Sequence, residues 1–204
     1  MTLVAFAGVA TAASATTIEY TSGGTVASGS AISGSLKSGT VAHLEGGSAG
    51  DIDCSASAFG GTLGTNPFTP SVTGSLTSLT FSSCTDTIPF VTVSSVTTNV
   101  GTGVNAKTAT ATWVAPGTNS TFAIAGVEVT VTFSSGSTCI YQPTGATATA
   151  KHNSNTTPKN NEYHFDDVPV TKIGGTFGFC PTNGVTWDAL YVATSGGTGI
   201  TIQD

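Results

Sequence analysis

Between Thr108 and Phe133 the chain alternates apolar and polar residues more regularly than elsewhere. The first part reads TATATWVA and the last part reads VEVTVTF. Alternation with a period of two is typical of strands that bury one face, and Pro116-Gly117 between the two parts is a turn signal. We therefore predict a β-hairpin here, with Trp113 in the core and a second arm that continues through Phe122 to Phe133.

Helices are not expected in the rest of the chain. Charged residues make up 8% of the sequence and arginine is absent, whereas Lys, Glu, Arg and Gln normally build helix surfaces. Thr, Val and aromatic residues occur in short runs between Gly, Ser and Pro, a composition typical of strands and turns. About a dozen short strands at spacings of roughly 8 to 12 residues predict an all-β fold, an antiparallel β-sandwich or a Greek-key barrel. We expect one β-sandwich domain over residues 16–204, with Asn99–Gly103 as a possible boundary between two halves.

Four cysteines are present, and none lies in a CxxC pair or beside a histidine at metal-ligand spacing. Disulfides are the natural interpretation if the chain is exported. Three connectivities are possible, and we favour the sequential one, Cys54 with Cys84 and Cys139 with Cys180. Loop-closure entropy would make each bridge contribute about 3 to 4 kcal/mol.

The first cysteine lies in a predicted strand from Asp51 to Phe59. Its alternation places four residues on the buried face: Ile52, Cys54, Ala56 and Ala58.

The first fifteen residues form an apolar run that ends in Ala13-Ser14-Ala15, the small-x-small pattern of a signal-peptidase site. Because no basic residue precedes the run, we interpret residues 1–15 as the remnant of a signal peptide, cleaved after Ala15. The alternative is a first buried strand over residues 3–10. No later stretch is apolar for long enough to span a bilayer. We expect a secreted, extracellular protein.

The formal net charge is −6, from 11 acidic residues against five lysines. With no arginine and few lysines, the chain lacks the basic patch that neutralises phosphates, so nucleic-acid binding is not expected.

A hydrolase interpretation rests on residues 46–50, which read GGSAG, with Ser48 as nucleophile and His43 and Asp51 nearby. A nucleophile elbow requires a strand, a sharp turn and a helix in an α/β sheet, which this composition does not favour. We expect a Gly/Ser turn instead. Asp51 and Asp53 could form a carboxylate pair, but alternate positions on one strand face are usually its solvated side.

The most polar segment, Lys151–Asp167, is expected to be a long exposed loop and the first place to look for function. In an extended chain Glu162, His164 and Asp166 share one face, and hard cations prefer clustered carboxylates. These residues and Asp167 are therefore candidate calcium ligands, with a solvated loop as the alternative. Otherwise no metal or cofactor is expected. His152 begins the same segment.

Tyr163, in this polar segment, is the candidate surface residue for stacking on a sugar or another small ligand. Asn119 and Asn155 each begin an N-x-S/T glycosylation sequon in a predicted loop.

The phrases DIDCSASAFGGT, GSLTSLTFSSCTD and TCIYQ resemble those of the secreted Thr/Ser/Gly-rich β-proteins of actinobacteria. The resemblance covers roughly residues 35–204 and implies an exported, disulfide-bonded β-sandwich, with no functional residues to transfer. A second likeness is to pilin-type subunits, in which an N-terminal strand is donated to a neighbour. Thr17–Thr21 is the segment that corresponds here.

From these observations we expect a non-enzymatic extracellular or cell-surface protein with a structural or interaction role. Its partner would be an extracellular protein or a glycan. Two alternatives remain: a carbohydrate or small-ligand binding module, and a self-assembling, pilin-like filament subunit.

Overall fold

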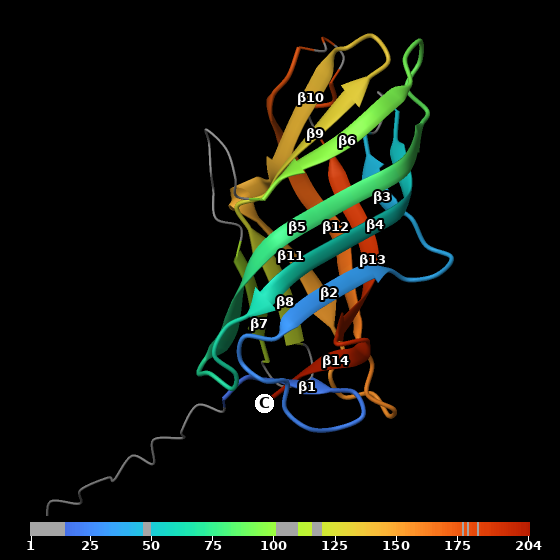
Figure 1. Cartoon of the computed structure of the whole chain (residues 1–204). Helices are drawn as coiled ribbons and strands as arrows, with labels where there is room; N and C mark the ends of the chain where they lie inside the picture. The colour runs from blue at the N-terminus through green and yellow to red at the C-terminus, as the bar shows by residue number, and fades with distance from the viewer. Residues whose placement is uncertain are drawn as a thin grey trace, which may run out of the picture.

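Strands provide nearly all the regular structure of the computed structural model, which describes residues 15–46, 50–100, 110–115, 120–176, 178, 180–182 and 184–204. The prediction of an all-β fold is confirmed (Figure 1). Among the described residues the strands are β1 (Thr17–Tyr20), β2 (Ala31–Leu36), β3 (Ala42–Glu45), β4 (Ile52–Leu63), β5 (Ser71–Asp86), β6 (Val93–Asn99), β7 (Thr110–Val114), β8 (Ser120–Ala125), β9 (Glu128–Phe133), β10 (Thr138–Pro143), β11 (Thr147–His152), β12 (Glu162–Gly174), β13 (Thr186–Ser195) and β14 (Thr198–Gln203). One short 3-10 turn, η2 (Thr144–Ala146), connects β10 to β11.

Eight strands pair in a closed antiparallel sheet, in the order β2, β4, β5, β7, β8, β11, β12, β13. The sheet closes because β13 pairs with β12 on one side and with β2 on the other. Towards one end β3 takes the place of β2 between β13 and β4. At the other end β14 pairs with β13, and β1 pairs with β14 (Figure 1). We call the eight strands the closed sheet.

Strands β6, β9 and β10 form an outer layer beside the closed sheet (Figure 1). The two parts share β12, whose pairing is irregular between Phe165 and Val168. The first part of β12 pairs with β11 and β13, whereas its last part pairs with β10 from Val170 to Gly174. The outer layer is therefore tied to the closed sheet through one long strand.

The predicted hairpin is confirmed in its first half, since β7 and β8 pair antiparallel with Trp113 opposite Phe122. Its turn at 116–117 lies outside the described residues. The second arm does not continue to Phe133, so that part of the prediction is wrong. The chain turns at Gly126, whose φ of 77° suits glycine, and β9 then joins the outer layer.

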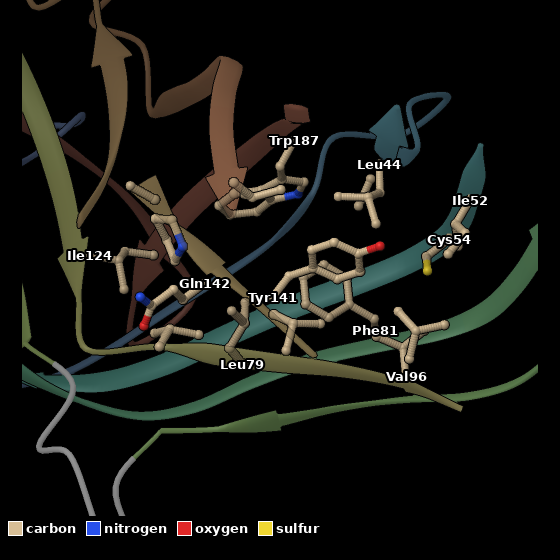
Figure 2. A pocket seen from close by; sticks show the side chains of 17 residues that line it. Leu44, Ile52, Cys54, Leu79, Phe81, Val96, Ile124, Tyr141, Gln142 and Trp187 are labelled. Carbon is tan, nitrogen blue, oxygen red and sulfur yellow. The ribbon is translucent and has the colours of Figure 1, made fainter. Parts of the chain in front are cut away.

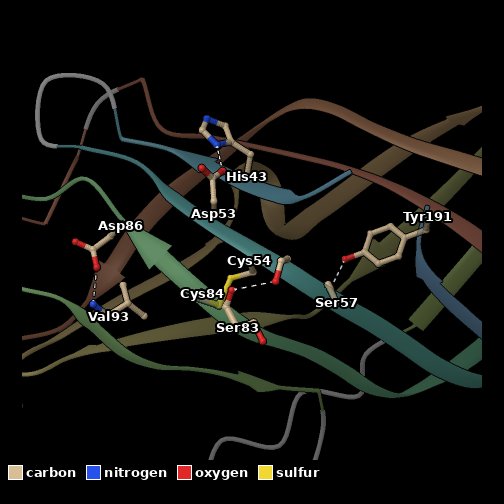
Figure 3. Close-up of a disulfide and its surroundings, with 10 residues drawn as sticks. His43, Asp53, Cys54, Ser57, Ser83, Cys84, Asp86, Val93 and Tyr191 are labelled. Carbon is tan, nitrogen blue, oxygen red and sulfur yellow. Dashed lines mark hydrogen bonds and ion pairs between the residues drawn. A yellow bond between two sulfur atoms is a disulfide. The ribbon is translucent and has the colours of Figure 1, made fainter. Parts of the chain in front are cut away.

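Both predicted disulfides form, Cys54–Cys84 between β4 and β5 and Cys139–Cys180 between β10 and the segment before β13. Cys54 and Cys84 lie directly opposite each other in the ladder (Figure 3).

The predicted buried face of the strand that contains Cys54 is confirmed only in part. Ile52 and Cys54 are buried, but Ala56 is exposed, whereas Ser57 is buried and hydrogen bonded to the Tyr191 hydroxyl at 2.6 Å. The alternation shifts by one residue where the facing strand places Ser83 at a φ of 52°. A local break of this kind in the pleat changes which side chains face inward.

An aromatic cluster fills the closed sheet around the buried ring of Phe122. This ring contacts four others at centroid distances of 5.0 to 6.1 Å: Phe59, Trp113, Tyr163 and Phe165. Trp113 is 3% exposed, so its predicted core position is confirmed.

The predicted signal peptide lies outside the described residues except for Ala15, as do residues 101–103 of the predicted boundary. The segment compared with a donated pilin strand pairs with β14 of its own chain. No helix in the described part of the chain is both long and apolar enough to cross a membrane.

Candidate functional site

An apolar cavity of about 60 Å³ lies where the outer layer meets one end of the closed sheet. A water molecule needs roughly 10 to 15 Å³ of such space, so the cavity is several times larger than the space that one water molecule needs. The side chains that surround it come from strands far apart in the sequence, among them Leu44, Phe81, Val96, Val129, Tyr141 and Trp187 (Figure 2).

Small side chains leave this space unfilled. Alanine and valine recur around the wall, including Ala42 on β3, Ala148 on β11 and Val170 on β12. Protein interiors are normally packed as closely as organic crystals, because each unfilled space loses dispersion contacts. A cavity of this size is therefore a specific feature of the fold.

The wall offers few polar groups. Tyr141 donates its hydroxyl hydrogen to the carbonyl oxygen of Pro181 at 3.3 Å, and burial raises its pKa to about 12, so it is neutral at physiological pH. Gln142 contributes a half-buried amide. The indole nitrogen Nε1 of Trp187 is buried and has no hydrogen-bond partner among the described residues. Among the residues that the structure describes, no Asp, Glu, Lys or His lines the cavity.

The segment predicted to be a long polar loop is shorter than expected. Lys151 and His152 end β11, and Glu162–Asp167 begin β12, so only residues 153–161 connect the two strands. The prediction of a loop to Asp167 is therefore wrong. The polar residues at its end are the outward side chains of a strand whose inward residues are aromatic.

Tyr163 is one of these inward residues and is 0% exposed, so its predicted surface position is wrong. Its hydroxyl donates to the carbonyl oxygen of Ile200 at 3.4 Å, and burial raises its pKa. It is a core residue and offers no platform for a sugar.

The candidate calcium ligands are only partly brought together. Glu162 pairs with Lys37 at 2.8 Å, and Asp167 is exposed in the irregular part of β12 at a φ of 47°. The carboxylate of Asp166 pairs with Lys151 at 2.7 Å, and this ammonium group lowers the pKa of Asp166.

His164 instead contacts a residue that the sequence did not indicate. Its Nε2 lies 3.1 Å from Oδ2 of Asp188, on the neighbouring strand β13. Ligand atoms of His164, Asp166 and Asp188 lie within 4.8 Å of one another. Asp188 was missed because only strand pairing brings β13 beside β12.

The proposed hydrolase residues do not form a catalytic pair among the described residues. His43 donates through Nδ1 to Oδ1 of Asp53 at 2.6 Å, which raises the pKa of His43 (Figure 3). Asp51 accepts a hydrogen bond from the backbone N–H of Gly46 at 3.0 Å. Ser48 lies outside the described residues.

His152 is a core residue, 2% exposed, rather than part of a surface cluster. Its Nδ1 donates to the carbonyl oxygen of Glu162 at 2.8 Å, and its Nε2 accepts from the Thr201 hydroxyl at 2.9 Å. The ring stacks on Tyr163 at a centroid distance of 4.6 Å. These contacts require the neutral imidazole, and burial lowers the pKa of His152.

We expect His152 to make the protein less stable as the pH falls below about 6.5. Its pKa is lowered in the folded state, so in this range the unfolded chain binds more protons and the free energy of unfolding decreases. The slope from one such group is at most about 1.4 kcal/mol per pH unit. Urea unfolding of the wild type and of His152→Gln between about pH 7.5 and 5.5 measures it.

The control for this measurement is His43→Gln. The pKa of His43 is raised, so its contribution is present below 6.5 and is lost as the pH rises through its folded value, which opposes the effect of His152. Loss of His152 should flatten the slope below 6.5, whereas loss of His43 should leave that slope nearly unchanged and alter stability mainly above 6.5. An unchanged slope in His152→Gln would contradict the assignment.

Of the two predicted glycosylation sequons, Asn155 is exposed in the β11–β12 connection. Asn119 lies outside the described residues. Comparison of the chain with protein-family models, curated proteins and solved structures finds no match.

Proposed function

We propose that this chain is a secreted, non-enzymatic binding protein that holds one small apolar molecule between the closed sheet and the outer layer. The observation that carries the proposal is the apolar cavity, which lies against the buried hydrophobic core. A ligand there would restore the dispersion contacts that the unfilled wall lacks.

The composition of the wall favours an apolar ligand over a carbohydrate. A sugar presents a hydroxyl on nearly every carbon, and each buried hydroxyl needs a hydrogen-bond partner. Of the polar side chains at the wall, Tyr141 already donates to Pro181, which leaves chiefly the Gln142 amide and the Trp187 indole. The burial of Tyr163 removes the one stacking residue that we had expected at the surface.

Two features support secretion. Disulfides persist in oxidising compartments, and this chain contains two, with no free cysteine among the described residues. The apolar run before Ala15 fits a signal-peptide remnant. Both features also agree with an extracellular structural or interaction protein, but neither accounts for a cavity.

The test is thermal unfolding with increasing toluene, using two valine variants of β6. Val96 lines the cavity, whereas Val93 is half-buried on the same strand and does not line it. At a toluene concentration ten times Kd, the wild-type Tm should rise by about 3 to 6 °C. Val96→Phe should abolish this rise by filling the space, and Val93→Phe should retain it. A wild-type Tm that toluene does not raise, or an equal rise in both variants, would refute the proposal.

A further inference from the structure

Trp187 is held in one orientation at the cavity wall. Its ring stacks on buried Phe165 at a centroid distance of 4.5 Å and an interplanar angle of 24°. Its backbone pairs with Val168 in the β12–β13 ladder. Figure 2 shows the ring among the side chains that surround the cavity, with its nitrogen on the side that faces Leu44. The direction of the indole N–H is therefore set by the fold.

This N–H is a buried donor with no partner among the described residues. Phe81 meets the ring edge-on at 6.3 Å, and an aromatic face accepts a hydrogen bond more weakly than oxygen does. A water molecule would be a poor partner, because buried water typically makes about three hydrogen bonds and the wall is almost entirely apolar. Buried polar groups in proteins are nearly always paired, so the donor points to an acceptor that the ligand brings.

On the basis of the function proposed above, we infer that the ligand is a small hydrocarbon framework with a single acceptor oxygen, such as a ketone or an ether. The oxygen accepts from Nε1 of Trp187, and the hydrocarbon packs against Val96, Val129 and Leu44. A carboxylate does not fit, because none of the described residues that line the cavity carries a cationic side chain to offset its desolvation.

The test compares cyclohexanone with methylenecyclohexane, which have the same shape but differ in the acceptor oxygen. Dissociation constants come from NMR titration of the wild type, of Trp187→Phe and of Trp113→Phe. Phenylalanine keeps an aromatic ring at position 187 and removes the N–H, whereas Trp113 is a core tryptophan that does not line the cavity.

Trp187→Phe should weaken binding of the ketone about fivefold relative to the hydrocarbon, the typical effect of one hydrogen bond. Trp113→Phe should leave the ratio of the two constants unchanged. If Trp187→Phe weakens both ligands equally, or leaves the ratio as in the wild type, the inferred hydrogen bond is wrong while apolar binding stands. If neither compound binds the wild type, the proposed function fails as well.

Discussion

Replacing Asn66 with alanine is expected to lower the free energy of unfolding by about 3 to 5 kcal/mol. The Asn66 side chain is buried beside β1, where its Nδ2 donates to the carbonyl oxygens of Ile18 at 2.8 Å and Val26 at 2.7 Å. Its Oδ1 accepts from the backbone N–H of Ile18 at 2.8 Å. Alanine would leave the Ile18 N–H and the Val26 carbonyl without these partners, whereas the Ile18 carbonyl would still accept from the Val26 N–H at 2.9 Å. Each buried unpaired group costs about 1 to 3 kcal/mol.

The free energy of unfolding is measured by urea unfolding, and two further variants serve as comparisons. Asn155→Ala changes an exposed asparagine and should alter stability by no more than about 0.5 kcal/mol. Asn66→Asp should be at least as harmful as Asn66→Ala, because a carboxylate oxygen would face the two carbonyl oxygens that now accept from Nδ2. If Asn66→Ala behaved like Asn155→Ala, these hydrogen bonds would not hold β1 in place.

Removing the Cys139–Cys180 disulfide in a double alanine variant should cost about 4 kcal/mol, as loop-closure entropy predicts for a separation of 41 residues. The bridge ties β10 of the outer layer to the segment that precedes β13. Its loss should therefore also increase local opening of the outer layer, which hydrogen exchange of β9 and β10 amides measures.

The matched control is the double alanine variant of Cys54 and Cys84, whose separation of 30 residues predicts nearly the same loss of stability. These cysteines join β4 and β5, which pair from Ile52 to Leu63, so exchange in β9 and β10 should change little relative to global stability. A Cys139 and Cys180 variant as stable as the wild type would remove the structural role that we assign to the bridge.

The sequence alone was sufficient to predict the all-β class and to favour the disulfide pairing that forms. The alternation around Trp113, the turn residues and the lack of helix-forming residues all indicate strands, and even numbers of isolated cysteines indicate bridges. These signals are local, because they depend on which side chains share a face of one segment. The same reasoning failed at Ser83 and at Gly126, which both have a positive φ. One such residue changes which side chains face the core, or ends a strand in a turn.

The candidate site depended on the tertiary structure. Backbone hydrogen bonds are the same for any two strands, so periodicity does not reveal that β13 lies beside β12, or that Asp188 meets His164. Polar residues around Tyr163 suggested an exposed loop, but they are the outer face of a strand. The cavity wall includes Leu44, Val96 and Trp187, which are far apart in the sequence. Pairing of β3 with β13 places Leu44 opposite Trp187, and packing of the outer layer on the closed sheet brings Val96 to the same space.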